Sequence, residues 1–449
     1  MPRVYIKTYG CQMNERDSEA VAAQLVAKGY EITPTEANAD VILLNTCSVR
    51  DMAEQKAINK MENLAGQTRK KRDVVLGFMG CMAQSRGQQL LDQLPDVDLV
   101  LGTQKFHRAA EYIDQLLAGK RDKIVDTAAE AGSEGTIKEH LLLGSAERKS
   151  VSAFVSIMQG CNQYCTFCIV PYTRGEERSR TIADIVAECR KLVEGGVREI
   201  TLLGQIVTSF GKREIPAVDG KSAFVQLLEA VHAIDGLHRI RFTSPHPKGY
   251  GDDLVEAYGR LPKLCQSAHI PLQSGSDRVL KLMHRGYTRE RFVGIINKLR
   301  KVKPDIGLTT DIIVGFPGET EDDFEQTLSL CREVQFDNAY LFKYSQRRDT
   351  PAAAMPDQLA EELKEERHAR ILELINDIGA GRYREHVGQQ MQILAEGPSR
   401  NNPSTMMGRT RCNKIVIFDG SPRHQAQLLD VKITRASLFT LHGDPAILE

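Results

Sequence analysis

The chain has 449 residues, enough for about three ordinary domains. Hydrophobic residues make up 41% and charged residues 26%, as in globular proteins with several packed cores. Lys and Arg together number 59, as do Asp and Glu, so overall basicity is excluded as a basis for binding nucleic acid, and an RNA site must be a local patch. The longest apolar stretches, such as residues 41–44, are too short for a signal peptide or a membrane span. We therefore expect a cytoplasmic monomer with no membrane contact.

Apolar runs and amphipathic stretches alternate in the N-terminal part of the chain. Three apolar runs are each followed by a helix-like segment: 4–6 by 18–28, 41–44 by 52–64, and 74–76 by 84–94. This alternation predicts an open parallel α/β sheet over residues 1–120. The stretch that follows is rich in Ala, Gly, Glu and Ser, and we place a linker at 121–146.

The central part of the chain contains six strand-like runs, each followed by a helix or a loop. They lie at 154–157, 199–203, 239–242, 269–272, 311–314 and 339–342. Six such units are too few to close an eight-stranded barrel, so we expect a partial (β/α)6 barrel over 147–378. A charged helix at 361–377 ends this region of the chain.

Short β-like runs characterise the C-terminal part. They lie at 390–394, 414–418 and 428–434. Because these runs are short and no helical stretch separates them, they predict a small all-β barrel over 380–444.

The strongest chemical signal is the pattern CxxxCxxC formed by Cys161, Cys165 and Cys168 after the first central strand. Active sites of such barrels lie at the carboxyl ends of the strands, and grouped cysteines in a reducing compartment indicate metal. Three thiolates leave one iron of a 4Fe-4S cluster open to S-adenosylmethionine. A zinc site is the alternative, but Asn162 and Gln163 supply no fourth ligand.

Three further cysteines, Cys11, Cys47 and Cys81, lie far apart in the sequence, yet each directly follows one of the N-terminal apolar strands. The carboxyl ends of neighbouring parallel strands converge on one crevice, so we expect the three thiols to meet there. Three unrelated buried thiols are the alternative. The repeated placement favours a second cluster, again with one open iron.

The CxxxCxxC motif after the first strand of a six-unit barrel resembles that of the radical S-adenosylmethionine superfamily. The resemblance implies that side chains and turns at the ends of later strands contact S-adenosylmethionine. The contacts implied are at Phe167, Gly204, Gln205, Ser244, Gln273 and Gly315. Gln205 stands where the superfamily often has Glu, so it offers a dipole rather than a charge.

The N-terminal motifs narrow the resemblance to the methylthiotransferase family. Residues 8–14 (TYGCQMN) and 45–47 (NTC) resemble its N-terminal domain, and 174–176 (RGE) continue into its radical domain. Residues 408–414 (GRTRCNK) resemble its RNA-binding TRAM domain, which implies RNA contacts by Arg409, Arg411 and Lys414.

Within the family, residues 10–14 and 271–276 (PLQSGS) look most like the bacterial MiaB-type branch, which modifies isopentenyl-adenosine beside the tRNA anticodon. One departure is Ile206, where relatives usually carry Asn. The implied reaction is methylthiolation at carbon 2 of the adenine. A radical from one S-adenosylmethionine removes hydrogen there, and the N-terminal cluster carries a sulfur that a second molecule methylates.

The implied cofactors and partners are two 4Fe-4S clusters, S-adenosylmethionine, the tRNA anticodon stem-loop, an electron donor such as flavodoxin, and a sulfur donor system. Two alternatives keep the chemistry but change the substrate to a threonylcarbamoyl-adenosine or a ribosomal-protein aspartate. A third is a non-catalytic, metal-stabilised RNA-binding protein. Among the other cysteines, Cys189 and Cys331 lie on apolar helix faces and are predicted to be core residues.

Overall fold

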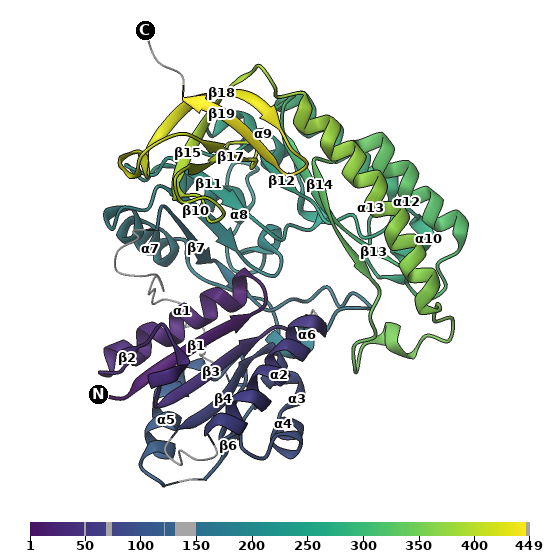
Figure 1. The fold of residues 1–449 in the computed structure, drawn as a ribbon. Coiled ribbons are helices and arrows are strands. Elements are labelled where there is room, and N and C mark those ends of the chain that lie inside the picture. The colour runs from purple at the N-terminus through teal and green to yellow at the C-terminus, as the bar shows by residue number, and fades with distance from the viewer. Residues whose placement is uncertain (49–50, 69–73, 121, 131–149, 446–449) are drawn as a thin grey trace.

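The computed structural model describes residues 1–48, 51–68, 74–120, 122–130 and 150–445. Its parts follow the chain order, with the N-terminal sheet at one end of the molecule and the C-terminal barrel at the other (Figure 1). Position 121 and positions 131–146 of the predicted linker lie outside the described residues. Among the described helices, none is both long and apolar enough to cross a membrane.

The N-terminal part is a parallel sheet of six strands in the order β2-β1-β3-β4-β5-β6. The strands are β1 Arg3–Tyr9, β2 Glu31–Ile32, β3 Val41–Thr46, β4 Val75–Gly80, β5 Leu99–Leu101 and β6 Ile124–Asp126. The helices are α1 Gln12–Ala27, α2 Asp51–Thr68, α3 Cys81–Arg86, α4 Gln88–Gln93 and α5 Ala109–Leu117. The predicted open α/β sheet is confirmed, and three of its strands, β2, β5 and β6, were not anticipated.

Side chains of β3 alternate between two apolar layers, as period-two geometry requires. Val41 and Leu43 pack with residues of α1 and α5, whereas Ile42 and Leu44 pack with residues of α2 and α4. The strand is therefore buried on both faces, which explains its continuous apolar sequence. The helix predicted over 84–94 is divided at Gly87, whose φ of +47° lies in the left-handed region.

The central part contains six parallel strands near the predicted places, although the fourth shares only His269 with the run predicted over 269–272. They are β7 Ser152–Ser156, β10 Glu199–Leu203, β11 Arg239–Phe242, β12 Ser267–His269, β13 Gly307–Val314 and β14 Asn338–Lys343. They form two three-stranded sheets, β11-β10-β7 and β12-β13-β14, and a parallel bridge between Ile240 and Leu264 joins the two. The predicted partial barrel is confirmed as an open arc of six strands.

The described helices of the central part lie between and after these strands in the sequence. They are α6 Val170–Arg174, α7 Ile182–Glu194, α8 Ala223–His232, α9 Asp252–Arg260, α10 Asp277–Leu282, α11 Arg289–Val302, α12 Glu321–Val334 and α13 Glu361–Arg384. A short antiparallel pair, β8 Met158–Gln159 and β9 Arg178–Ser179, brackets the cysteine loop. The predicted charged helix is α13, and Tyr383 near its end packs into the C-terminal core.

The C-terminal part is a closed barrel with the strand order β15-β16-β17-β19-β18. The strands are β15 Gln390–Pro398, β16 Met406–Thr410, β17 Ile415–Phe418, β18 Leu428–Ala436 and β19 Thr440–Pro445. The predicted all-β barrel is confirmed. Sequence reasoning missed β16 and β19, because glycine and polar residues interrupt their apolar alternation.

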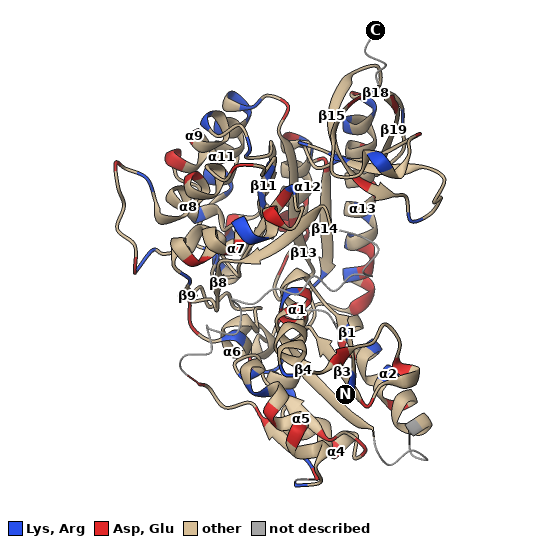
Figure 2. Ribbon diagram, turned by 90° about the vertical axis from the view of Figure 1, so that its left-hand side faces the viewer, with Lys and Arg blue, Asp and Glu red and all other residues tan. Residues whose placement is uncertain are grey.

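Helix α1 docks the N-terminal sheet onto the central part through buried charges (Figures 1 and 2). Arg16 pairs with Glu188 of α7 at 3.1 Å, and Arg180 pairs with the same carboxylate at 2.6 Å. The next residue, Asp17, pairs with Arg174 of α6 at 2.6 Å. These five side chains are at most 6% exposed, so the buried charges of Arg16 and Asp17 depend on partners across the interface.

We predict that Glu188→Ala destabilises this interface by about 3–5 kcal/mol. The substitution removes the α7 carboxylate that pairs with both Arg16 and Arg180, while both guanidinium groups stay buried. Urea unfolding followed by circular dichroism, together with limited proteolysis, measures the effect. The control is Glu325→Ala, which breaks a half-exposed pair with Arg370 and is expected to cost less than about 1 kcal/mol. Equal shifts in the two variants would contradict the prediction.

Candidate active site

The three N-terminal cysteines lie at one edge of the sheet, because β1, β3 and β4 are adjacent and parallel. Cys11 follows β1 and caps α1, Cys47 follows β3, and Cys81 begins α3 directly after β4. The backbone N–H of Cys47 donates to the carbonyl of Tyr9 at 2.9 Å, which extends the β1–β3 ladder into the site. The structure thus brings these cysteines together at the edge where the sequence places them.

Hydrogen bonding and charge distinguish the thiols of this group. A hydrogen bond with the Cys47 side chain is the main reason why the pKa of Cys11 is lowered to about 6, and nearby Arg174 contributes. Burial raises the pKa of Cys81, while the positive charge of Arg174, and to a smaller extent a hydrogen bond from it, oppose that rise. Cys11 and Cys81 therefore both feel the Arg174 guanidinium.

Two buried asparagines hold the strand ends that carry these cysteines. The Asn14 amide donates to Asn45 Oδ1 at 3.1 Å, and the Asn45 amide donates to the Asn14 carbonyl at 2.8 Å. Gly80 lies against them with a φ of +96°, and a Cβ there would stand 2.2 Å from Asn45 Oδ1. Sequence reasoning quoted these asparagines only as parts of motifs and gave them no role.

The central cysteines lie in the loop after β7 and β8. The N–H of Cys168 donates to the carbonyl of Cys165 at 3.0 Å, which curls the loop on itself. Burial raises the pKa of Cys161 to about 11 and that of Cys168 to about 12. Buried Arg285 donates to Cys165 Sγ at 3.3 Å. Sequence reasoning missed Arg285, because nothing in the chain pattern connects it with a loop 120 residues earlier.

One short segment connects the two cysteine groups. The side chain of Arg174 reaches Asp17, Cys11 and Cys81, whereas the carbonyl of the next residue, Gly175, accepts a hydrogen bond from the N–H of Cys161 at 3.0 Å. Helix α6 belongs to the central part by sequence, yet it packs against α3 of the N-terminal part (Figure 1). Residues 174 and 175 therefore connect the two cysteine groups directly.

Several residues predicted to contact S-adenosylmethionine lie at the carboxyl ends of the central strands. The Oε1 atoms of Gln205 and Gln273 are buried without a hydrogen-bond partner, and so is Nε2 of His246. Left-handed backbone occurs at Ser244, with a φ of +56°, and at Gln273, with a φ of +67°. Leaving buried polar atoms without partners is costly, so these three atoms are unsatisfied in the ligand-free protein.

The remaining predicted contacts are apolar or glycine positions. Phe167 packs on a cluster that includes Met283 and Phe316. A Cβ at Gly204 would stand 2.7 Å from Met158 Cγ, and one at Gly315 would stand 2.4 Å from the Lys364 side chain. Both glycines thus permit close packing, and Gly315 also adopts a φ of +72°. Ile206, which departs from the family pattern, is buried at 6% exposure.

The three basic residues predicted to contact RNA already have partners within the protein. Arg409 donates to Glu396 at 2.9 Å, and Arg411 donates to the carbonyls of Pro262 and Leu264. Lys414 is 2% exposed and pairs with Asp337 between the barrel and the central part. A phosphate contact by Lys414 would require this interface to open. In the structure, the Lys414 side chain instead binds the barrel to the central part.

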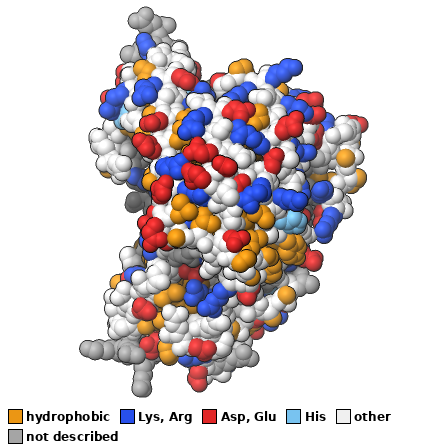
Figure 3. Space-filling view, turned by 90° about the vertical axis from the view of Figure 1, so that its right-hand side faces the viewer, with side chains coloured by type: hydrophobic (Ala, Val, Ile, Leu, Met, Phe, Trp, Pro, Cys, Tyr) orange, Lys and Arg blue, Asp and Glu red, His pale blue; other side chains and the backbone are white. Residues whose placement is uncertain are grey.

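Among the described residues, the face of the molecule drawn in Figure 3 has no single basic patch that could serve as an RNA site. Figure 3 shows acidic and basic side chains intermixed over the face that carries α12 and α13. Arg370, for example, pairs with both Glu321 and Glu325 there. Acidic neighbours thus balance the charge of Arg370 on this face.

The described residues contain no group of three or more His, Cys, Asp or Glu side chains that could hold one metal ion. The thiols that hold a 4Fe-4S cluster each bind a different iron, so they need not close around a single centre. Each cysteine group has a buried arginine beside it, Arg174 in the N-terminal group and Arg285 in the central group. Three thiols beside a buried cation suit an anionic cluster.

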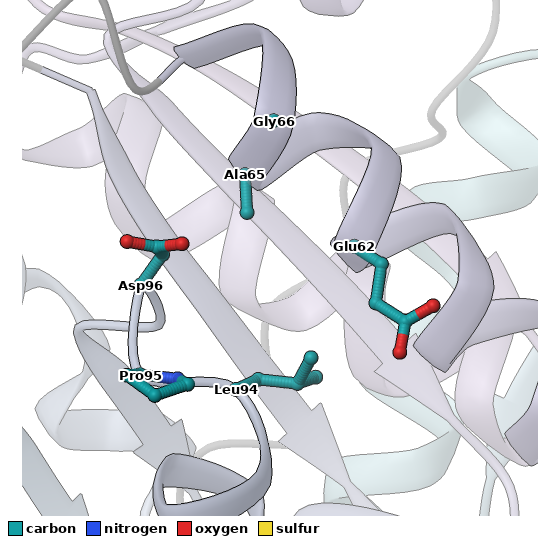
Figure 4. A pocket seen from close by; sticks show the side chains of 6 residues that line it. All are labelled: Glu62, Ala65, Gly66, Leu94, Pro95 and Asp96. Carbon is teal, nitrogen blue, oxygen red and sulfur yellow. The ribbon is translucent and has the colours of Figure 1, made fainter.

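A shallow pocket of about 180 Å³ lies elsewhere, between the end of α2 and the loop before β5 (Figure 4). It is lined by Glu62, Ala65, Gly66, Leu94, Pro95 and Asp96. The loop enters the amino end of β5, whereas the cysteines follow the carboxyl ends of their strands, so the pocket lies at the opposite edge of the sheet.

Comparison with known families agrees with this arrangement. Residues 3–102 match the uncharacterized protein family UPF0004, residues 155–331 match the radical SAM superfamily, and residues 384–446 match the TRAM domain. The radical S-adenosylmethionine methyltransferase TsrM from Kitasatospora setae, with cobalamin and a [4Fe-4S] cluster bound, shares the fold. Its TM-score is 0.56 at 12% identity, covering 79% of this chain and 77% of that one. The fold and the site thus define a radical SAM enzyme with UPF0004 and TRAM domains.

Curated relatives narrow this class. The chain is 53% identical to the tRNA-2-methylthio-N(6)-dimethylallyladenosine synthase of Opitutus terrae, over 99% of this chain and 97% of that protein. It is 50% identical to the synthase of that name from Akkermansia muciniphila, over 99% of both. The chain belongs to the tRNA-2-methylthio-N(6)-dimethylallyladenosine synthase family of tRNA methylthiotransferases.

We predict that Cys11 of the cluster-free protein reacts with iodoacetamide on the order of a hundredfold faster than Cys168 at pH 7. Both side chains are partly exposed, but the pKa of Cys11 is about 6 and that of Cys168 about 12. The thiolate of Cys11 should be present at pH 7 and be lost as the pH falls through 6. Peptide mapping by mass spectrometry measures the rates.

The Cys47→Ala variant provides the control, because it removes the main cause of the low pKa of Cys11. Its Cys11 should begin to react only at higher pH. An unchanged pH profile would contradict the assignment of the shift to Cys47.

Proposed function

We propose that this enzyme places a methylthio group on carbon 2 of isopentenyl-adenosine beside the anticodon of tRNA, giving 2-methylthio-isopentenyl-adenosine. The curated relatives carry this activity in their names, over nearly the full length of the chain. The observation that carries the proposal is the connection of two cysteine groups through Arg174 and Gly175. A sulfur-bearing centre and a radical-generating centre must serve one substrate atom, and a shared site meets that need.

The six cysteines are the proposed cluster ligands. One 4Fe-4S cluster would be held by Cys11, Cys47 and Cys81, and the other by Cys161, Cys165 and Cys168. Three protein ligands leave one iron of each cluster open. When bound, the clusters and S-adenosylmethionine supply the radical, the sulfur and the methyl group, which no side chain can provide at an aromatic C–H.

The protein contributes binding, orientation and exclusion of water. Gln205 and Gln273 present buried amide oxygens that accept hydrogen bonds, which suits the methionyl ammonium of S-adenosylmethionine. Burial lowers the pKa of His246 to about 2, so the ring is neutral near pH 7. Its Nδ1 accepts from the N–H of Lys248 at 3.2 Å, so Nε2 carries the proton and can donate to the ligand.

The substrate and partners complete the proposal. A tRNA substrate is consistent with the TRAM match and with the names of the relatives. We further propose that the anticodon stem-loop is the part bound, that a flavodoxin-like protein supplies electrons, and that a separate system restores the sulfur. The working unit is a cytoplasmic monomer, with its domains at 1–120, 147–378 and 380–444.

Nucleoside analysis tests the reaction. A strain that lacks the enzyme should accumulate isopentenyl-adenosine in its tRNA and lose the 2-methylthio form, and the intact gene should restore it. Unchanged 2-methylthio-isopentenyl-adenosine would exclude the proposal. Loss of methylthiolation from threonylcarbamoyl-adenosine, or from a ribosomal-protein aspartate, would favour the substrate alternatives instead.

Iron analysis tests the two clusters separately. Anaerobic reconstitution should give about eight irons per chain. Replacing Cys11, Cys47 and Cys81 by Ala, or Cys161, Cys165 and Cys168 by Ala, should leave about four. The control Cys331→Ala changes a core cysteine that is 0% exposed and should retain the full iron content. Zinc in place of iron, with no deoxyadenosine formed under reducing conditions, would support the non-catalytic RNA-binding alternative.

Gln205 tests the proposed ligand contacts. Gln205→Leu should weaken S-adenosylmethionine binding about tenfold, the equivalent of roughly 1.4 kcal/mol, and should stabilise the ligand-free protein because an unpaired buried oxygen is removed. Calorimetry and thermal unfolding measure the two effects. The matched control is Gln115→Leu on α5, which also removes an unpaired buried Oε1 but should leave binding unchanged. Equal binding losses in both variants would contradict the assignment.

A further inference from the structure

The N-terminal cysteine group contains a buried cation that cysteine ligation does not itself require. Arg174 is 5% exposed, and it enters the group from α6 of the central part. Its NH2 donates to Asp17 Oδ2 at 2.6 Å and its NH1 to Asp17 Oδ1 at 3.4 Å. The same guanidinium hydrogen-bonds Cys81 and interacts with the charge of Cys11.

The hydrogen-bond capacity of Arg174 exceeds the demand of Asp17. A guanidinium has five N–H donors in a planar fork, and Asp17 accepts two of them. The remaining donors are available to sulfur at the N-terminal edge. One carboxylate balances one guanidinium, so a cluster bound by three thiolates would add negative charge beside an already neutral pair.

The backbone around Arg174 fixes where this charge lies. Thr103 of the N-terminal part donates to the carbonyl of Thr173 at 2.5 Å, and the N–H of Gly175 donates to the carbonyl of Pro171 at 3.1 Å. Gly175 in turn accepts from Cys161. The guanidinium is therefore held between elements of both parts and has little freedom to withdraw from the cysteines.

We propose that Arg174 is a positioning residue that raises the reduction potential of the cluster held by Cys11, Cys47 and Cys81. Reduction adds negative charge to a cluster, and a fixed buried cation stabilises the reduced form more than the oxidised form. Asp17 limits this effect, because its carboxylate opposes the field of Arg174. The inference rests on the proposed function, since it requires a cluster at these cysteines.

The test uses the full chain in which Cys161, Cys165 and Cys168 are replaced by Ala, so that only the N-terminal cluster is present. Anaerobic redox titration, followed by electron paramagnetic resonance, gives its midpoint potential. Arg174→Gln should shift the ratio of reduced to oxidised cluster at least tenfold toward the oxidised form, which is about 59 mV for one electron. Arg174→Lys retains the charge and should recover at least half of the shift.

Asp17→Asn gives a prediction of opposite sign. It removes the negative charge beside Arg174, so the midpoint potential should rise above that of the parent. The control is Arg180→Gln, which removes another buried arginine of the same interface, one paired with Glu188 and bonded to the carbonyl of Ser156. It should leave the midpoint potential unchanged.

Each outcome decides the inference. Equal potentials in Arg174→Gln and the parent, or equal shifts in Arg174→Gln and Arg180→Gln, would overturn it. If the Arg174→Gln variant cannot hold a cluster, the Asp17→Asn variant provides the test. A midpoint potential in Asp17→Asn that equals or falls below that of the parent would overturn the inference. If the parent itself binds no iron at the N-terminal cysteines, the proposed function fails. If the N-terminal cluster forms normally but Arg174→Gln leaves its potential unchanged, only the proposed role of Arg174 fails.

Discussion

The parallel pairing of β1, β3 and β4 is the constraint on which the rest of the molecule depends. Tyr9 pairs with Thr46, and Thr46 pairs with Gly80, so the three strands end at nearly the same level of the sheet. The chain reverses direction after each of these strand ends. Each reversal begins within two residues of a cysteine. A slip of one residue in any strand would turn its apolar side chains to the wrong layer, so the same register that buries the core also gathers the thiols.

Much of the architecture follows from local pattern. The apolar runs of β3 and β4 are continuous because both strands are buried on both faces. Their short length and the helical stretch that follows each of them identify them as strands. Strands β5 and β6 have three residues each, too few for a periodic signal. The positions of the cysteines were accessible for a related reason, because a residue just after a recognisable strand is placed by the topology of the sheet.

The arginines of the site were beyond the reach of sequence reasoning. Arg174 and Arg285 act at cysteines on other elements, and only the folded chain brings them together. The RNA contacts predicted from the motif at 408–414 had the reverse weakness. A sequence motif cannot tell a basic side chain that faces solvent from one, such as Lys414, that is buried in an ion pair between two domains.

The buried charges on α1 carry an evolutionary consequence. Arg16 and Asp17 are matched to acceptors and donors on α6 and α7, so neither half of the interface can change alone without stranding a charge away from water. A hybrid that combined this N-terminal sheet with the barrel of a distant cousin would need to transplant both sides of the contact. The first domain is therefore fitted to the barrel it faces and is not an interchangeable module.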